Sequence, residues 1–175
     1  NHLGKNIEKY DSMLILAHFK GHPQGGYGGA LKQLSIGCAS RAGKALIHSV
    51  GQSDDRIECW DKHGSNVTFP EAMADAAASV VRYFGKSIAF INVMKNLSVD
   101  CDCDPNPSEP DMHDVGVLAS TDPLAIDQAC IDLVYAMPDS ENLIRRIESL
   151  NGLHTLEAAE AIGLGSRTYN LVIIE

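Results

Sequence analysis

The chain alternates short apolar runs with longer stretches of helical periodicity, and this alternation limits its fold more than any other feature. Apolar runs of strand length occupy residues 12–17, 87–94, 115–119 and 169–174. Apolar residues at helical spacing fill 68–84, 122–137, 141–150 and 155–162, and a short helix is expected near 30–34. The pattern predicts a layered α/β fold with a mostly parallel sheet flanked by helices. A chain of 175 residues can bury one substantial core, so we expect a single domain over residues 1–175.

Polar residues mark the starts of two of these helices. Thr68 can cap a helix, and Pro70 suits its first turn. Asp122 directly precedes Pro123 and is most simply a second helix cap. Asp127 lies further along the same helix, and we expect it on a polar face.

Composition excludes several classes of partner. The formal net charge is −9, without a basic cluster that could follow a phosphate backbone, so we expect no nucleic-acid partner. The apolar runs are much shorter than a bilayer span, and no leader-like segment precedes them, so we expect no membrane partner. The chain has five cysteines, an odd number, which favours a reducing compartment and a cytoplasmic location.

The composition of the segment from His18 to His48 is typical of a binding site and unlike that of a hydrophobic core. It holds three histidines and seven glycines, directly after an apolar run. Glycines weaken regular elements, and imidazoles gain little from burial unless they are paired. We therefore expect the chemistry of this chain to lie here.

Candidate residues also follow each of the first three predicted strands. Because ligands bind beyond the carboxyl ends of the strands in such sheets, we expect three loops to meet at one edge. The residues concerned are His18 after the first strand, Lys95, Asn96, Cys101 and Cys103 after the second, and Ser120, Thr121 and Asp122 after the third.

Cysteines offer one kind of chemistry. Cys101 and Cys103 form a C-x-C pair on a polar loop, and Cys38 lies in the glycine-rich segment. Thiolates bind zinc or iron, and a histidine such as His48 or His18 would complete a tetrahedral set. The alternative is a pair of ordinary loop cysteines.

Glycines and lysines offer another kind. Lys32 follows a glycine cluster that could cradle a cofactor phosphate, although the cluster matches neither common phosphate-binding motif. The alternative is a tight irregular loop. Ser120, Thr121 and Asp122, at a helix start, could also hold an anion. Lys20, Lys32 and Lys95 would attract a small anionic ligand. The glycines of the cluster are Gly25, Gly26, Gly28 and Gly29.

Four stretches of the chain resemble one protein family. They are the string from His18 to Ser49, CDCD at 101–104, DVGVLASTDPLAIDQACIDLV at 114–134 and HTLEAAEAIGLGSRTY at 154–169. Together they are similar to the domain of unknown function 362 family, whose members are often described as iron–sulfur cluster-binding proteins. The resemblance implies a metal ion or an iron–sulfur cluster as cofactor.

The chain departs from this family in two respects. Many members carry a ferredoxin-type insert after the position of His48, whereas residues 50–66 here hold one cysteine, Cys59. Members are also longer at the N-terminus, so we expect this chain to be the C-terminal part of a larger fold. A companion chain would supply the missing half, or a homo-oligomer would cover the open sheet edge.

A remoter likeness concerns the spacing of His22, Lys32 and His48, which is similar to that of the nickel-pincer lactate racemases. This likeness implies Lys32 as the tether of the pincer cofactor, His48 as a nickel ligand and His22 as the acid/base. The racemases use a second acid/base histidine from an N-terminal half that this chain lacks. His18 is kept as a further catalytic candidate because imidazoles titrate near neutral pH.

Three hypotheses therefore stand for the function. The first is a metal- or iron–sulfur-binding domain in redox or electron-transfer service. The second is an isomerase-type enzyme that uses His22, Lys32 and His48 with a pincer-type cofactor. The third is a non-catalytic module that binds a ligand or a partner.

Overall fold

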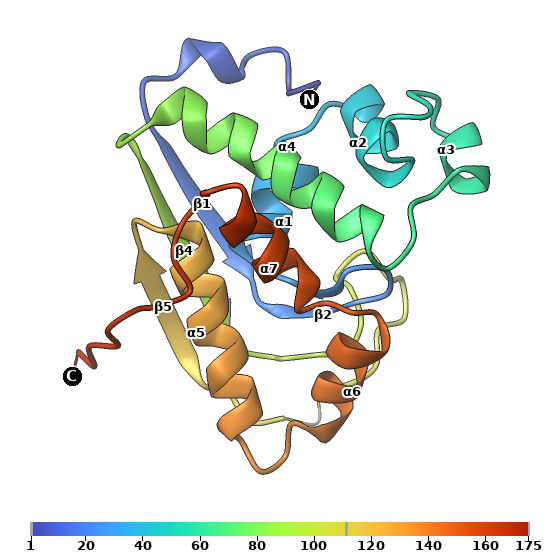
Figure 1. Cartoon of the computed structure of the whole chain (residues 1–175). Helices are drawn as coiled ribbons and strands as arrows, with labels where there is room; N and C mark the ends of the chain where they lie inside the picture. Colours follow the sequence, from blue (N-terminus) through green and yellow to red (C-terminus); the bar gives the residue numbers. More distant parts are fainter. Residues whose placement is uncertain (1, 111, 175) are drawn as a thin grey trace.

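The computed structural model describes residues 2–110 and 112–174. Within this part of the chain, a three-stranded sheet and a small hairpin are surrounded by seven α-helices (Figure 1). The strands are β1 (Met13–His18), β2 (Lys20–His22), β3 (Gly26–Gly28), β4 (Ile88–Met94) and β5 (Gly116–Ser120). The helices are α1 (Ala30–Lys32), α2 (Arg41–His48), α3 (Glu58–Asp61), α4 (Thr68–Phe84), α5 (Pro123–Ala136), α6 (Glu141–Ser149) and α7 (His154–Ala161). A 3-10 turn, η1 (Ile7–Lys9), precedes β1, and a π-helical turn, η2 (Gln33–Gly37), continues α1.

The α/β class is confirmed, but the sheet is mixed. Its strand order is β1-β4-β5, with β1 and β4 parallel and β4 and β5 antiparallel. The chain passes from β1 to β4 through α1, α2 and α4, which makes a helical crossover between parallel strands. It passes from β4 to β5 through a helix-free loop, so β5 runs back along β4. The prediction of a mostly parallel sheet was wrong for this pair.

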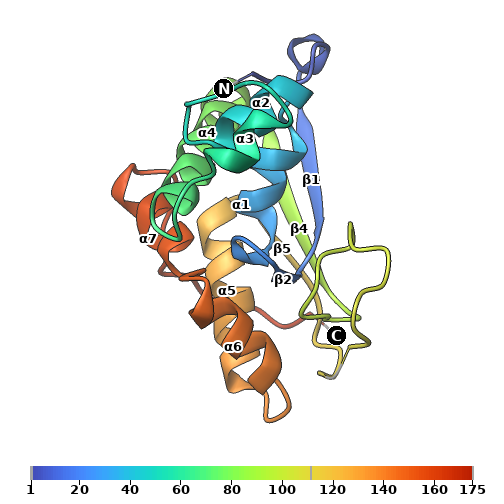
Figure 2. The same cartoon turned by 90° about the vertical axis from the view of Figure 1, so that its right-hand side faces the viewer.

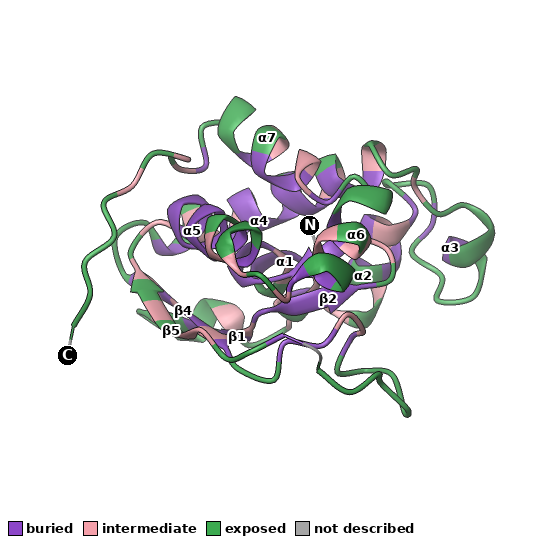
Figure 3. Cartoon of the chain, turned by 90° about the horizontal axis from the view of Figure 1, so that it is seen from below, coloured by how far each residue is buried: buried purple, intermediate pink, exposed green. Residues whose placement is uncertain are grey.

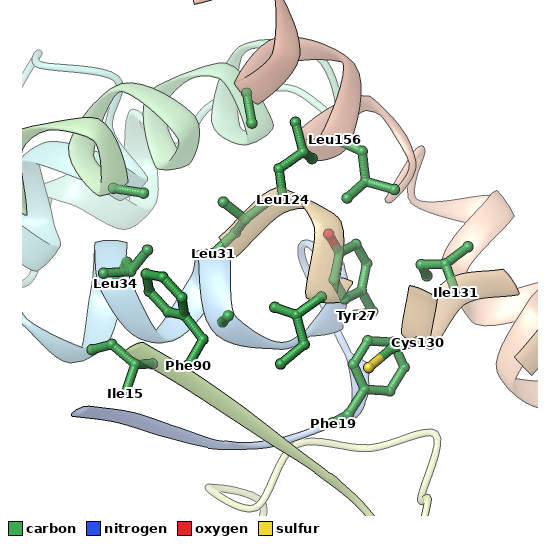
Figure 4. Packing of buried hydrophobic residues seen from close by; sticks show 14 of the residues in the cluster. Ile15, Phe19, Tyr27, Leu31, Leu34, Phe90, Leu124, Cys130, Ile131 and Leu156 are labelled. Carbon is green, nitrogen blue, oxygen red and sulfur yellow. The ribbon is translucent and has the colours of Figure 1, made fainter. Parts of the chain in front are cut away.

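The core lies between the sheet and the helices on one of its faces. Residues along β4 alternate between buried and half-buried, as a strand with one covered face requires. Phe90 of β4, Leu31 of α1 and Leu124 of α5 meet in this core (Figure 4). Phe19, at the end of β1, stacks on Tyr27 of β3 with ring centroids 5.5 Å apart. The hairpin of β2 and β3 is therefore fixed to the main core.

A buried carboxylate connects three of these elements. Asp127 of α5 accepts hydrogen bonds from the backbone N–H groups of Ala30 and Leu31, at 2.8 and 3.0 Å. It also accepts one from the side-chain amide of Asn92 on β4, at 2.7 Å. The expected polar face is thus wrong for Asp127, because the helix α5 is buried on this side and the carboxylate caps α1. Burial raises the pKa of Asp127 to about 6.

One expected strand is missing. Residues 169–174 form no strand ladder in the described part of the chain and are exposed or half-buried. The other predicted helices and strands lie within about two residues of their predicted bounds, except the short helix near 30–34, which η2 lengthens to Gly37. The hairpin strands β2 and β3 and the helices α2 and α3 were not predicted. Asp122 caps α5 as expected, accepting from the N–H groups of Leu124 and Ala125.

The cap on α1 leads to a stability prediction. An added Cβ at Gly29 would lie 2.5 Å from the Asp127 carboxylate oxygen, although the backbone of Gly29 is extended and suits any residue. We expect Gly29→Ala to destabilise the fold by at least about 2 kcal/mol in urea unfolding. Gly4→Ala is the control, since its Cβ would meet only an ordinary contact at 3.7 Å. Equal stability of both variants would contradict the cap.

Candidate functional site

The β2–β3 hairpin positions two basic side chains in the interior. Lys20 pairs with Gly28 and His22 pairs with Gly26. Both Lys20 and His22 are only 5% exposed. Alternation along a strand places Lys20 and His22 on the same side of the hairpin, with Gly21 between them facing the other way. The hairpin therefore presents a buried cation beside a buried imidazole.

The loop after β4 is held against β2. The N–H of Gly21 donates to the carbonyl of Ser98 at 2.8 Å, and an added Cβ at Gly21 would lie 2.1 Å from the Val99 carbonyl oxygen. Arg146 of α6 donates to the same Val99 carbonyl at 2.8 Å. Figure 2 shows this loop running beside β2 and the end of β1. These contacts bring the C-x-C pair to the hairpin.

The C-x-C pair forms a hydrogen-bonded dithiol. The thiol of Cys103 donates to Sγ of Cys101 over 2.9 Å, and both cysteines are free of disulfides. Cys103 is exposed, whereas Cys101 is 5% exposed and lies with its Sγ 3.7 Å from Nζ of Lys20. Burial opposes ionisation of Cys101, but the hydrogen bonds from Cys103 and the charges of Lys32 and Lys20 lower its pKa on balance. The hydrogen bond to Cys101 and burial raise the pKa of Cys103.

Two lysines meet above Gly28. An added Cβ at Gly28 would lie 3.1 Å from Nζ of Lys20 and 3.3 Å from Cδ of Lys32. Burial, followed by the charge of Lys20, lowers the pKa of Lys32. The nearest carboxylate oxygen to Lys20 belongs to Asp102 and is 4.0 Å away. Glycine at position 28 is therefore what leaves room for the lysine pair.

His18 ties the C-x-C loop to the end of the sheet. Its Nδ1 lies 2.8 Å from an oxygen of Asp102, and its Nε2 lies 2.7 Å from the carbonyl oxygen of Lys95. Both ring nitrogens thus face oxygen acceptors. His18, expected as a catalytic residue, holds Asp102 between the two cysteines in this structure.

His22 is a neutral imidazole. Burial, with the nearby charges of Lys32 and Lys20, lowers its pKa to about 2. Its Nδ1 accepts hydrogen bonds from the N–H groups of Gly25 and Gln24, at 3.1 and 3.3 Å. The proton of the neutral ring therefore lies on Nε2.

His48 lies in an aromatic setting near a cavity. Its ring stacks on Phe69 with centroids 4.9 Å apart and tilts against Trp60 at the same distance. Burial, followed by the charge of Lys32, lowers its pKa to about 4. Its Nδ1 is buried and has no hydrogen-bond partner among the described residues. The adjoining cavity of about 230 Å³ is lined by His48, His63, Phe69, Pro23 and Leu150, among others.

The structure brings together only part of the predicted site. The loop after β5 was expected beside the other two, but Ser120 pairs with Phe90 in the middle of β4. Because β5 is antiparallel, Ser120, Thr121 and Asp122 lie toward the far end of the sheet from His18. The convergence of three loops was therefore wrong for this one. Two loops meet, those after β1 and β4.

The glycine cluster serves packing at two positions. An added Cβ at Gly26 would lie 2.8 Å from Cα of Gly152, and Gly29 lies against Asp127. The first N–H groups of α1 are taken by Asp127, so they are not open to a phosphate. Gly25 offers its N–H to His22, and Gly28 borders the lysines.

The predicted metal ligands are divided among three places. Cys38 lies at the end of η2, where its carbonyl accepts a hydrogen bond from the N–H of Gly4. His48 lies among aromatic rings, and Cys101 and Cys103 lie beside Lys20. Residues 2–110 and 112–174 contain no group of three or more His, Cys, Asp or Glu side chains that could hold a metal ion.

The sequence reasoning missed the role of Asp127 and Asn92. Both are fully buried, and together they fix the start of α1 and with it the position of Lys32. A signal was present in the sequence: Asp127 lies in the run PLAIDQACI, residues 123–131, in which Gln128 is the only other polar residue. A carboxylate in such a helix needs an interior partner.

With this geometry in place, the comparisons identify the family. The model of a domain of unknown function, DUF362, matches residues 1–132, and the chain belongs to this family. No curated protein and no solved structure matches the chain. Within the described residues, none of the helices combines the length and the apolar character needed to span a bilayer.

The setting of His48 leads to a pH prediction. An unfolded chain takes up a proton on this residue near pH 6.5, whereas the folded chain does so only near pH 4. Stability from this residue is therefore present above pH 6.5 and is lost as the pH falls toward 4. His48→Phe keeps the aromatic stacking but has no proton to take up. As the pH falls from 7 to 5, we expect its free energy of unfolding, measured in urea, to rise by about 1 kcal/mol relative to that of the wild type. Parallel pH profiles of the two proteins would contradict the buried neutral ring.

Proposed function

We propose that this domain binds a small anion at the lysine pair Lys20 and Lys32, beside the Cys101–Cys103 dithiol. One observation carries the proposal. The ammonium of Lys20 is buried, yet its nearest anionic or ionisable neighbours are the Cys101 sulfur at 3.7 Å and an Asp102 oxygen at 4.0 Å. A buried charge is stable only when a close opposite charge compensates it. An anion between the two lysines would supply that compensation.

The Cys101 sulfur is the group that takes the place of this anion within the chain. It lies beside Lys20, is stabilised by the hydrogen bond from Cys103, and has a lowered pKa. Even when ionised, this one thiol could not neutralise two lysines. A ligand carrying a carboxylate or phosphate would share the lysines with Cys101 and come within reach of its sulfur. The thiolate is the nucleophilic form of cysteine. The exposed thiol of Cys103 and the half-buried Lys32 mark the side from which the ligand would arrive.

A metal or an iron–sulfur cluster, which the family resemblance implies, is the second candidate. The observation that favours it is the contact between the Cys101 and Cys103 sulfurs. Two thiols are half of the four ligands that a cluster or a structural zinc uses. Cys38 and His48 lie elsewhere, and Lys20 would repel a cation. The donor set of residues 2–110 and 112–174 does not fit a complete site, and any further ligands would come from outside these residues.

The racemase-like alternative has less support from the geometry. Lys32 acts electrostatically on both His22 and His48, so the three side chains are neighbours. However, an imidazole with a pKa of about 2 is a weak proton acceptor near neutral pH. His22 is therefore better suited to positioning the hairpin through Gly25 than to moving a substrate proton.

The anion proposal predicts the behaviour of lysine variants with inorganic phosphate as the probe. Phosphorus NMR or calorimetry at low ionic strength should detect binding to the wild type. We expect Lys20→Met and Lys32→Met each to weaken binding at least about tenfold, because each removes a charge-assisted contact. The control is Lys95→Met, a solvent-exposed lysine next to the same loop. Cys101→Ser should bind phosphate more tightly, because it removes the sulfur that competes for Lys20.

Two results would overturn this proposal. One is the absence of phosphate and sulfate binding at millimolar concentration. The other is an equal loss in the Lys95→Met control, which would show attraction to general surface charge. Thermal melting of each variant separates lost binding from lost folding.

Metal analysis decides between the two candidates. We expect the wild-type chain, purified without oxygen, to retain no stoichiometric iron, zinc or nickel, since only two thiols converge. One equivalent of metal that is lost in the Cys101→Ser/Cys103→Ser double variant and kept in Cys38→Ser would favour the metal candidate instead. A visible absorbance band from iron in the same sample would identify a cluster.

A further inference from the structure

The segment 170–174 has the composition of a strand but no partner strand. Its sequence NLVII is apolar after Asn170, and its last three residues are β-branched, a pattern typical of a buried strand. The structure leaves it extended and uncovered, with Val172 at 76%, Ile173 at 83% and Ile174 at 91% exposure. Figure 1 shows this end of the chain leaving the body beside β5. Such a segment gains free energy only by finding an edge to pair with and a surface to cover it.

The residues directly before this segment are held in place. Arg167 donates from Nε to the side-chain oxygen of Gln128 at 2.7 Å, and the Tyr169 hydroxyl donates to Asp132 at 2.7 Å. Both acceptors lie on α5, which packs on β4 and β5. Residues after Tyr169 therefore start from a defined place next to β5, and they point away from their own sheet.

The sheet offers a matching free edge. In the described part of the chain β5 pairs with β4 alone, so its other edge has open N–H and C=O groups. β5 has five residues, Gly116–Ser120, the same length as the segment 170–174. A strand with both faces apolar suits this edge, because the sheet has a core face and an exposed face that is itself apolar.

The exposed face of the sheet is seen in Figure 3, on the side away from the helices. Leu14 and Leu16 of β1 are 59% and 61% exposed, and Val117 of β5 is 60% exposed. The strand register places Leu16 beside Ile91 and Val117 beside Val93, so these side chains form one continuous patch. An apolar patch of this kind marks an interaction surface.

We propose that two copies of this chain exchange the segment 170–174, each adding it as a fourth strand to the free edge of β5 in the other copy. Each copy has one unpaired strand and one unpaired β5 edge, so the exchange satisfies both and closes with two-fold symmetry. The occupant is a second copy because the segment leaves its own sheet after Tyr169. This inference is independent of the anion site, which lies at the other end of β4.

Light scattering coupled to size-exclusion chromatography tests the exchange on the intact chain. We expect the wild type to be a dimer. Leu171→Pro/Val172→Pro removes backbone donors at two successive positions, whichever one faces the edge, and should raise the dimer dissociation constant at least tenfold. The matched control, Leu171→Thr/Val172→Thr, keeps both N–H groups, has a β-branched residue at both positions and should retain most of the dimer. Because the segment is exposed within one copy, both variants should have the melting temperature of the wild type measured at a dilution where it is monomeric.

Three results would overturn the proposal. A wild type that stays monomeric at every concentration tested would do so. A proline variant that remains as dimeric as the wild type would show that another surface makes the contact. A monomer whose β5 amides are protected from hydrogen exchange, and lose that protection in the proline variant, would show that the segment pairs within its own copy.

Discussion

The carboxylate of Asp127 is the contact on which the rest of the structure depends. It is fully buried, yet it is tied to three donors from two other elements, the start of α1 and the strand β4. Two of these donors are the first free N–H groups of a helix, where a negative charge is favoured. The contact sets α5, α1 and β4 at fixed positions around the core, and it requires glycine at position 29 because no Cβ fits against the carboxylate.

The placement of the lysine pair follows from that contact. Lys32 lies at the end of α1, whose start Asp127 caps, and Lys20 lies on the hairpin strand that faces Gly28. Both lysines thus lie on segments that buried interactions hold in place. Burial, followed by the charge of Lys20, lowers the pKa of Lys32, so holding two buried cations this close is costly. The fold supplies the Cys101 sulfur, 3.7 Å from Lys20, and an Asp102 oxygen at 4.0 Å as partial compensation, and this incomplete compensation is the basis of the proposed anion site.

Much of the fold could be predicted from periodicity, and the exceptions have physical causes. Helix α5 follows from its Asp122 cap and its apolar spacing. Helix α4 follows from its apolar spacing alone, because Thr68, expected as its cap, is its first residue and accepts a hydrogen bond from the N–H of Ser65 instead. The direction of β5 depends on a loop that carries no periodic signal. Residues 169–174 have every local property of a strand, but a strand needs a partner that the sequence of one copy does not reveal. In the candidate site, residue type and position after a strand singled out His18, Cys101 and Cys103, and the glycine cluster before it singled out Lys32; the structure places these candidates near one another. Asp127 was missed because a carboxylate among apolar residues was interpreted from its own helix, without the donors that α1 brings to it.

The C-x-C loop shows why the family resemblance and the geometry give different answers about a metal. The resemblance implies a cluster through the description that members carry, and many members hold the required cysteines in an insert. In this chain the corresponding residues, 50–66, contain Cys59 alone, and its thiol donates to the carbonyl of Arg56. The cysteines that remain next to the site lie against a buried ammonium, a setting that stabilises a thiolate but disfavours a bound cation. Lys20 therefore favours anion chemistry over metal chemistry, independently of any count of cysteines.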